Sequence, residues 1–375
     1  MLRIVADSNI PFLKGALDNV AHVNYIQGSE IKREHLVNTD ALIIRTRTKC
    51  NETLLRNTPV KFIASATIGF DHIDTDYCQK NGIKWTNAPG CNSGSVKQYV
   101  ASALAEIMCK ENWLFKDVTL GIIGAGNVGK KVESLANTLG IKTLVNDPPR
   151  ERLEGKGNFT EIDELISKSD IVTVHVPLIN QGIDKTYHLA NSEFFSKMKK
   201  NAWFINTARG EVTDTPALTQ SLISKHIAGA VVDVWENEPC INRELLRVSQ
   251  ISTPHIAGYS ADGKANGTAM SVRAISKFFN LGLDNWSPPH IPSAKQNQLQ
   301  INCNNKSPED IYREISLFAY NINTDSEKLK KSPDTFEKQR ENYPIRREPE
   351  NISVKLNSCS NSISSMIKKL DYPID

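Results

Sequence analysis

Short apolar runs alternate with amphipathic stretches over the first part of the chain. The apolar runs predict strands at residues 2–6, 23–26, 41–45, 61–66 and 84–86. The amphipathic stretches between them predict helices, among them residues 11–20, 52–57 and 75–81. Strands that alternate with helices form a parallel sheet that helices cover on both faces. This part of the sequence therefore predicts one α/β domain.

The same alternation begins again after a long predicted helix at residues 95–110. Further strands are predicted at residues 119–123, 143–145, 171–175, 203–206, 229–234 and 250–252. An amphipathic helix at 257–282 follows the last of these strands, and we expect it to return to the first domain. The pattern predicts a second α/β domain that interrupts the first.

The character of the sequence changes near residue 286, where S-P-P-H-I-P-S is typical of a linker. The remainder is rich in Asn, Ser and Lys, so disorder is the alternative to a fold. Alternation at 299–303 and an apolar helical stripe at 311–319 favour a fold. Ser307 and Ser332, each followed by proline, are typical helix N-caps. We expect a small α+β domain here.

Composition and charge exclude several classes of protein. The net charge of +3 is too small to indicate a nucleic-acid partner or an acidic membrane surface. No apolar run approaches the roughly 20 residues of a membrane span. The 7 cysteines, an odd number without C-x-x-C, argue against a disulfide framework or a zinc site. We expect a cytoplasmic protein without a metal, a membrane or a nucleic-acid partner.

A glycine-rich turn stands between the predicted strand at 119–123 and the helix that follows. Such a turn places backbone N–H groups and a helix N-terminus against a pyrophosphate, while its glycines allow close approach. The pattern alone is a weak signal, because any glycine-rich turn can match it. The residues of the predicted phosphate-binding turn are Gly124, Gly126, Asn127, Val128 and Gly129.

Asp147 ends the next predicted strand, about 20 residues beyond the turn. A carboxylate at this place accepts hydrogen bonds from the adenosine ribose and repels a 2′-phosphate. The sequence therefore predicts NAD in preference to NADP. Arg150 lies close enough to weaken this argument, although a solvated loop arginine is the simpler interpretation.

Three further strings, N-T-A-R-G at 206–210, D-V-W-E-N-E-P at 233–239 and T-P-H-I-A-G at 253–258, supply an Arg, a Glu and a His. Arg209 can anchor a carboxylate through its planar guanidinium. His255 can accept the proton of a hydroxyl group, and Glu238 can orient its imidazole. Each residue alone could be an ordinary turn residue. Their shared place after predicted strands, behind a nucleotide-binding turn, favours an alcohol-oxidising site.

Over residues 1–285 the chain resembles the D-isomer-specific 2-hydroxyacid dehydrogenases. The strings I-R-T-R-T-K at 44–49, A-T-I-G-F-D-H-I-D at 66–74 and A-P-G-C-N at 88–92 carry this resemblance together with those above. It implies a flavodoxin-like substrate domain at 1–94 and 256–285 and a Rossmann NAD domain at 95–255, both doubly wound. The string F-E-K-Q-R-E-N-Y-P-I-R-R-E at 336–348 resembles the additional C-terminal domain of one subfamily. That likeness implies a homodimer formed through residues 286–375.

The resemblance also implies roles for individual residues. Arg209, Glu238 and His255 would be catalytic, with His255 as the proton donor and acceptor. The implied cofactor contacts are Asp147, Val176, Thr207, Ala208, Asp233 and Gly258, and the implied substrate contacts are Thr46, Thr67 and Tyr259.

The resemblance further implies a small phosphorylated 2-hydroxy acid as the substrate. Arg45 and Arg47 are the candidates for its phosphate, although one of them could serve only to stabilise the fold. Two other functions stay open: a dehydrogenase of another 2-hydroxy acid, such as 3-phosphoglycerate, and a binding protein that senses NAD(H). The string S-V-K-Q-Y-V has Lys97-Gln98 where the family commonly has Ala-Glu.

Overall fold

The computed structural model describes residues 1–375, and the chain divides into two compact units. One unit comprises Met1–Asn92 and Ser260–Pro292, and the other comprises Ser93–Tyr259 and Ser293–Asp375. Each unit contains a fully parallel sheet with helices, as the alternating pattern predicts. The α/β fold class is therefore confirmed.

The first unit has a five-stranded sheet in the order β2-β1-β3-β4-β5, the flavodoxin-like order. Alternate residues of each strand point to opposite faces. Ile4 and Ile43 pack with Val272 and Ile275 of α10, while Val5 belongs to the core of the other face. The elements of this unit are β1 (Arg3–Asp7), β2 (His22–Ile26), β3 (Ala41–Ile44), α1 (Glu52–Leu55), β4 (Phe62–Ser65), α2 (Thr75–Lys80), β5 (Lys84–Thr86) and α10 (Ala261–Phe279).

The helix predicted at residues 11–20 is wrong, because the structure has successive turns there. Phe12 and Gly15 both have positive φ angles, 65° and 87°, which a right-handed helix cannot accommodate. The Tyr25 hydroxyl accepts a hydrogen bond from Gly15 N (3.1 Å) and donates one to Asp18 (2.8 Å). These contacts with a neighbouring strand replace the hydrogen bonds of a helix.

The second unit has a six-stranded sheet in the order β11-β10-β9-β8-β6-β7. An isolated parallel bridge between Val145 and Phe159 adds one more residue beside β7. With Phe159 counted as a vestigial outer strand, the order contains the 3-2-1-4-5-6 arrangement of a Rossmann fold. The strands are β6 (Thr119–Ile123), β7 (Lys142–Asn146), β8 (Ile171–Val174), β9 (Trp203–Asn206), β10 (Gly229–Val232) and β11 (Ile251–Ser252).

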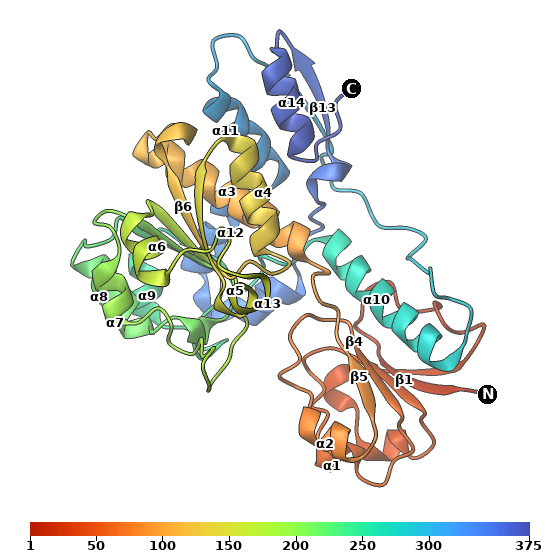
Figure 1. Ribbon diagram of the computed structural model, residues 1–375. Helices are drawn as coiled ribbons and strands as arrows, with labels where there is room; N and C mark the ends of the chain where they lie inside the picture. Colours follow the sequence, from red (N-terminus) through yellow and green to blue (C-terminus); the bar gives the residue numbers. More distant parts are fainter. The chain divides into compact units, whose positions relative to one another are not determined.

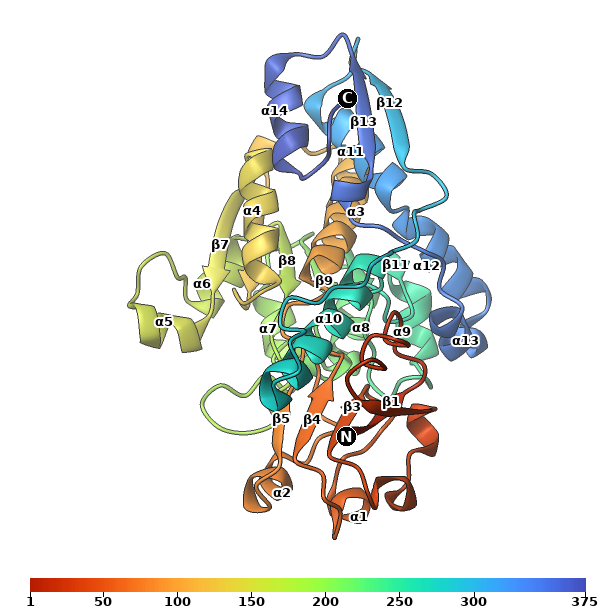
Figure 2. The same ribbon diagram turned by 90° about the vertical axis from the view of Figure 1, so that its right-hand side faces the viewer.

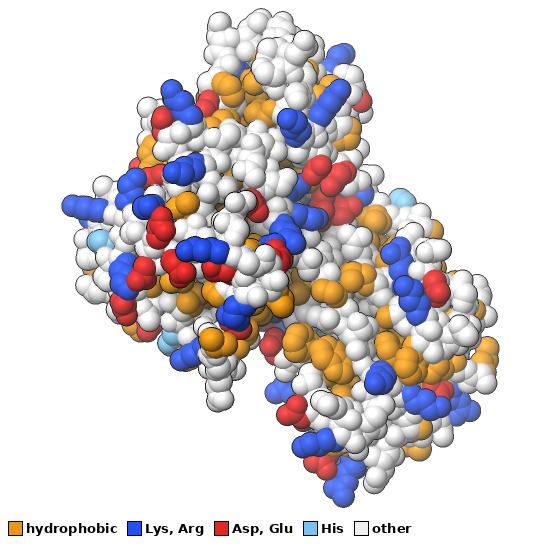
Figure 3. Space-filling view, in the orientation of Figure 1, with side chains coloured by type: hydrophobic (Ala, Val, Ile, Leu, Met, Phe, Trp, Pro, Cys, Tyr) orange, Lys and Arg blue, Asp and Glu red, His pale blue; other side chains and the backbone are white.

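Alternation along these strands divides the second unit into two cores. Leu120 and Ile205 pack under α3 and α4, whereas Val172 and Phe204 pack under the helices of the opposite face. The helices are α3 (Ser93–Glu111), α4 (Gly129–Leu139), α5 (Pro148–Glu154), α6 (Ile162–Lys168), α7 (Ser192–Lys197), α8 (Thr215–Ile223) and α9 (Arg243–Val248). Lys and Arg side chains are interspersed with Asp and Glu on the face that Figure 3 shows.

The C-terminal residues form helices and strands that pack within the second unit. In Figures 1 and 2, α11 lies beside α3, and in Figure 2, α12 lies beside β11. Ser252 N of the edge strand β11 donates a hydrogen bond to Ser326 of α12 (3.0 Å), so the helix covers an edge that would otherwise be exposed. The elements are β12 (Gln298–Asn302), α11 (Pro308–Ala319), α12 (Ile322–Lys331), α13 (Phe336–Glu341), β13 (Ser353–Asn357) and α14 (Asn361–Lys369).

The predicted helix caps and the cysteines of the C-terminal residues agree only in part with the structure. Ser307 caps α11 as predicted, but Ser332 caps nothing with its side chain and precedes a short 3-10 helix instead. Cys303 and Cys359 form a disulfide, which the cysteine count argued against, and the other 5 cysteines are free. None of the helices is both long and apolar enough to cross a membrane.

Replacing Phe204 by Ala tests the core of the second sheet. Phe204 is fully buried, and its ring meets those of Phe194 and Phe195 edge to face. We expect the free energy of unfolding to fall by about 3–5 kcal/mol, as it does when a buried aromatic side chain is truncated. Urea unfolding followed by circular dichroism measures it. Leu153→Ala, at a residue 86% exposed, should change it by less than about 0.5 kcal/mol. Equal effects of both variants would contradict this account of the core.

Candidate functional site

Three neighbouring strands of the second sheet carry the residues predicted to be catalytic. In the register of the sheet, Asn206 of β9 lies beside Val232 of β10, and Val232 lies beside Ser252 of β11. Arg209, Glu238 and His255 come shortly after these three strand ends in the sequence. The carboxyl edge of an open parallel sheet is where ligands bind in folds of this class.

His255 and Glu238 are in direct contact. The Nδ1 atom of His255 lies 2.8 Å from Oε2 of Glu238. The other carboxylate oxygen, Oε1, accepts a hydrogen bond from the backbone N–H of Trp235 (2.9 Å). Because Nδ1 faces the carboxylate, Nε2 is the nitrogen of His255 that is left for a substrate.

The electrostatic surroundings keep Glu238 ionised. Burial opposes the charge and by itself would raise the pKa of Glu238. The positive charge of His255, its hydrogen bond and that of Trp235 N, together with the charge of Arg340, outweigh burial and lower this pKa below its ordinary value. The carboxylate is therefore suited to orient the imidazole and to stabilise its protonated form.

Asp233 holds the loop that carries His255. Its Oδ1 accepts hydrogen bonds from the Thr253 hydroxyl (2.6 Å) and from Ile256 N (2.8 Å), and its Oδ2 accepts one from Ala257 N (2.9 Å). The backbone N–H of His255 donates to the carbonyl oxygen of Asp233 (2.7 Å). Asp233 is 1% exposed, so in this structure its carboxylate serves the loop. Its implied role as a cofactor contact stays a prediction.

The turn that contains Arg209 is shaped by two neighbours. The buried side chain of Asn206 accepts a hydrogen bond from Ala208 N (2.9 Å) and donates to Arg209 O (2.9 Å). A Cβ atom on Gly210 would lie 2.0 Å from the backbone of Trp235, so only glycine fits there. These contacts bring the turn of Arg209 against the start of the segment that leads to Glu238.

The glycine turn after β6 has the shape that a dinucleotide requires. A Cβ atom on Gly129 would lie 1.9 Å from the carbonyl oxygen of Gly124, so the start of α4 packs directly on the turn. Gly124 has a φ of 89° and lies against the backbone of His175. A Cβ atom on Gly126 would meet nothing within 4 Å, so this backbone is open to a ligand. Asn127 and Val128 complete the turn at the N-terminus of α4, which suits an anionic group.

Asp147 lies beside this turn and caps α5. Its Oδ2 accepts a hydrogen bond from Ala125 N (2.8 Å), and its Oδ1 accepts one from Arg150 N (3.1 Å). Arg150 donates two hydrogen bonds to Glu154 (2.8 and 2.7 Å), so its positive charge is paired with that carboxylate. The position of Asp147 therefore suits a ribose contact, and Arg150 has a carboxylate partner of its own.

His175 and Thr207 face each other at the ends of β8 and β9. The Nδ1 atom of His175 lies 3.3 Å from the Thr207 hydroxyl, and Nε2 lies 3.0 Å from that of Thr173. Burial lowers the pKa of His175 to about 3, so the side chain is neutral and does not exchange protons near pH 7. The next residue, Val176, has a methyl group near Gly124 and packs on the core below.

Gly258 and Tyr259 lie in the turn after His255, where Tyr259 N donates to Ile256 O (2.9 Å). Both residues are half-buried. The Tyr259 ring packs edge to face on Tyr343, with 5.9 Å between centroids. A C-terminal residue thus contacts a predicted substrate-binding residue.

In the first unit, Thr46 and Thr67 follow the adjacent strands β3 and β4, so they lie at one edge of that sheet. The Thr67 hydroxyl lies 2.8 Å from that of Ser65. Arg45 donates from Nε to the fully buried Asp7 (3.0 Å), so this arginine stabilises the fold. Arg47 lies on an exposed turn, and its role as a phosphate contact stays a prediction.

Several residues at the site escape prediction from sequence. Asn206 belongs to the string N-T-A-R-G at 206–210, but its role in shaping the turn of Arg209 can be recognised only from the structure. Tyr99, on α3, reaches the Thr253 hydroxyl (2.7 Å) from 154 residues away, a pairing without a local signal. No group of three or more His, Cys, Asp or Glu residues is arranged to bind a metal ion.

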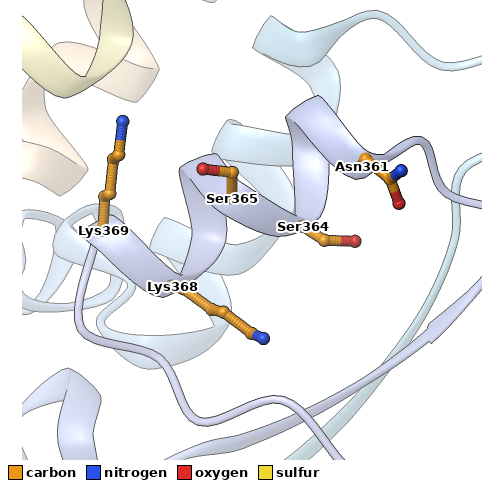
Figure 4. A pocket seen from close by; sticks show the side chains of 5 residues that line it. All are labelled: Asn361, Ser364, Ser365, Lys368 and Lys369. Carbon is orange, nitrogen blue, oxygen red and sulfur yellow. The ribbon is translucent and has the colours of Figure 1, made fainter.

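A surface hollow on α14 does not involve these residues. It is lined by Asn361, Ser364, Ser365, Lys368 and Lys369. Figure 4 shows that Lys368 and Lys369 point in different directions, so their charges do not converge on one ligand.

Comparison with known proteins adds to this geometry. Residues 105–257 match the family described as D-isomer specific 2-hydroxyacid dehydrogenase, NAD binding domain. Residues 290–370 match a domain of unknown function. Among solved structures, D-lactate dehydrogenase from Aquifex aeolicus, complexed with NAD and lactic acid, has a TM-score of 0.63 and 29% identity, covering 75% of this chain and 96% of that one.

Curated relatives match almost the whole chain. Erythronate-4-phosphate dehydrogenase of Bacteroides fragilis is 47% identical over 348 residues, which are 92% of this chain and 97% of the relative. The Escherichia coli protein of the same name is 36% identical in an alignment of 379 positions that covers 99% of this chain and 98% of the relative. With the dehydrogenase family match and the His255–Glu238 pair behind a dinucleotide turn, this likeness assigns the chain to the erythronate-4-phosphate dehydrogenases, NAD-dependent members of the D-isomer-specific 2-hydroxyacid dehydrogenase family.

Proposed function

We propose that this protein oxidises C2 of 4-phospho-D-erythronate to (R)-3-hydroxy-2-oxo-4-phosphobutanoate with NAD, in the biosynthesis of pyridoxal 5′-phosphate. The likeness to erythronate-4-phosphate dehydrogenases over nearly the whole chain supports this substrate. The observation that carries the chemistry is the contact of 2.8 Å between His255 and Glu238 after adjacent strand ends. NAD, when bound, accepts the hydride that leaves C2.

The protein's own residues then have distinct tasks. His255 takes the hydroxyl proton at Nε2, while Glu238 holds Nδ1 and stabilises the resulting positive charge. Arg209 binds the substrate carboxylate. The resemblance leads us to place Thr46, Thr67 and Tyr259 at the substrate as well. In the reverse direction His255 returns the same proton.

The cofactor contacts are part of the same proposal. The backbone of the turn at Gly124–Gly129 would hold the pyrophosphate, and Asp147 would hold the adenosine ribose. Val176, Thr207, Ala208, Asp233 and Gly258 are the further contacts that we propose.

We further propose a homodimer formed through residues 286–375 and a cytoplasmic location. The 5 free cysteines fit a reducing compartment, whereas the disulfide between Cys303 and Cys359 is unusual in one. Sedimentation analysis of the intact protein tests the dimer directly.

Turnover with three groups of substrates tests the function. The purified protein is assayed with NAD against 4-phosphoerythronate, 3-phosphoglycerate and unphosphorylated D-2-hydroxy acids. We expect the highest kcat/KM with 4-phosphoerythronate. A higher kcat/KM with 3-phosphoglycerate would identify that acid as the substrate instead. Tight binding of NADH without turnover of any acid would instead support an NAD(H) sensor.

His255→Ala should lower kcat by about 10²–10⁴-fold, because the reaction loses its proton acceptor. The affinity for NADH, measured by fluorescence titration, should stay unchanged. His290→Ala, at an exposed position, is the matched control and should be fully active. If NADH binding falls as far as kcat does, the proton-transfer role is wrong.

Asp147→Asn should weaken NAD binding and reduce the discrimination against NADP, since it removes the charge that repels a 2′-phosphate. The Asn side chain can still cap α5, so the helix should stay intact. Asp147→Ala removes both the charge and the cap, and it should also lower the melting temperature. An unchanged ratio of kcat/KM for NAD and NADP in Asp147→Asn would remove this residue from the ribose site.

The lowered pKa of Glu238 predicts how stability depends on pH. Ionised Glu238 stabilises the folded state above its ordinary pKa of 4.5, and this contribution is lost as the pH falls through the lower folded-state pKa. Glu238→Gln cannot titrate there. The advantage of the wild type in free energy of unfolding should therefore shrink between about pH 6 and pH 3. An advantage that grows on acidification would contradict the direction of the shift.

A further inference from the structure

Arg340 is a C-terminal residue that contacts the candidate active site. It lies on α13, which is anchored by Phe336, 1% exposed in the same core as Phe204. The Arg340 side chain is 20% exposed, and its Nη1 atom pairs with Glu337 at 3.1 Å. A guanidinium held in this way has a defined position within the second unit.

Tyr259 connects Arg340 to the loop of His255. The guanidinium carbon of Arg340 lies 5.6 Å from the centre of the Tyr259 ring, within the range of a cation–π contact. The Tyr259 hydroxyl is also one of the groups that raise the pKa of Arg340. Tyr343 packs on the same ring edge to face. Two C-terminal side chains thus fix a ring that stands four residues after His255.

The charge of Arg340 also acts on Glu238. The groups that face Glu238 are His255, from the loop after β11, the N–H of Trp235, and Arg340, from α13. Arg340 in turn faces the carboxylates of Glu238 and Glu337 and the hydroxyl of Tyr259. A cation at this place favours the ionised carboxylate that orients the imidazole.

We propose that Arg340 is a positioning residue for the reaction: it fixes Tyr259 against the substrate and supports the carboxylate of Glu238 that orients His255. The inference rests on the proposed function, because Tyr259 and Glu238 matter only if His255 exchanges a proton with a bound hydroxy acid. It gives the C-terminal residues a part in the chemistry in addition to assembly.

Steady-state kinetics of the full-length protein over a range of pH tests the proposal. Arg340→Met removes the charge and the cation–π contact with Tyr259 and should lower kcat/KM for 4-phosphoerythronate by about 10- to 100-fold, as expected for the loss of a largely desolvated cation–π contact. The acidic limb of its profile of kcat/KM for oxidation against pH should move to higher pH, because the coupled His255–Glu238 pair binds a proton more readily once a neighbouring cation is gone. Arg340→Lys keeps the charge and should restore the position of that limb and part of the rate.

Three further variants separate positioning from mere stabilisation. Arg247→Met removes an exposed arginine of the same unit and should leave kcat/KM within about twofold. Glu337→Gln removes the ion pair that holds Arg340 but keeps the guanidinium, and it should shift the acidic limb less than Arg340→Met does. Tyr259→Leu removes the ring that Arg340 contacts, and combined with Arg340→Met it should lose less than the product of the two single losses, because the two residues act together.

Three other results would contradict the positioning role of Arg340 or the proposed function. If Arg340→Met keeps its rate within about twofold of an active wild type, Arg340 has no positioning role. If Arg340→Met and Arg340→Lys lose equal activity and melting temperature with an unmoved acidic limb, the residue only stabilises the fold. A folded wild type that binds NADH but turns over no hydroxy acid would overturn the proposed function, and the inference with it.

Discussion

The buried carboxylate of Asp233 is the contact on which the geometry of the reacting pair depends. Three donors from residues 253–257 converge on its two oxygens, and its own carbonyl accepts the N–H of His255. A charge with 1% exposure would be costly without such partners. The same requirement that the carboxylate be fully hydrogen-bonded therefore fixes the path of the loop, and with it the direction of the imidazole.

Close backbone contacts set the remaining distances of the site. The turn of Arg209 can approach Trp235 only because residue 210 lacks a side chain, and α4 can approach the turn after β6 only because residue 129 lacks one. Gly126 differs from both, since a side chain there would meet no protein atom. Packing requires glycine at residues 129 and 210 but does not explain the glycine at 126. The proposed contact of its backbone with the cofactor would account for it.

Much of the fold follows from local patterns in the sequence. Short apolar runs predict the strands of both sheets, because each strand is buried on both faces and contributes to two cores. The segment at 11–20 has apolar spacing similar to that of a helix, but backbone angles at Phe12 and Gly15 oppose it. Such angles are decided by distant partners, here the hydroxyl of Tyr25. A pattern of polarity does not contain them.

The candidate site also has one part that the sequence predicts and another that it does not. Strings beside the strand ends predict where Arg209, Glu238 and His255 lie, because the sheet brings its carboxyl ends to one edge. Contacts across long sequence separations, such as Tyr99 with Thr253 and Arg340 with Tyr259, have no such signal. The disulfide between Cys303 and Cys359 is of this kind as well. These contacts depend on tertiary structure.

The packing of α12 and α13 has a consequence for how this chain can change in evolution. Leu329 and Phe336 are fully buried in the core that Phe204 and Val172 also line, so deleting these helices would expose that core. In an ancestor that gained such a segment, large apolar side chains of the original core could later be replaced by smaller ones, since the added helices cover that core. After such replacements, deletion of the added helices would expose a core that the remaining side chains could no longer fill. The segment would then be retained even in a descendant that no longer required its original benefit.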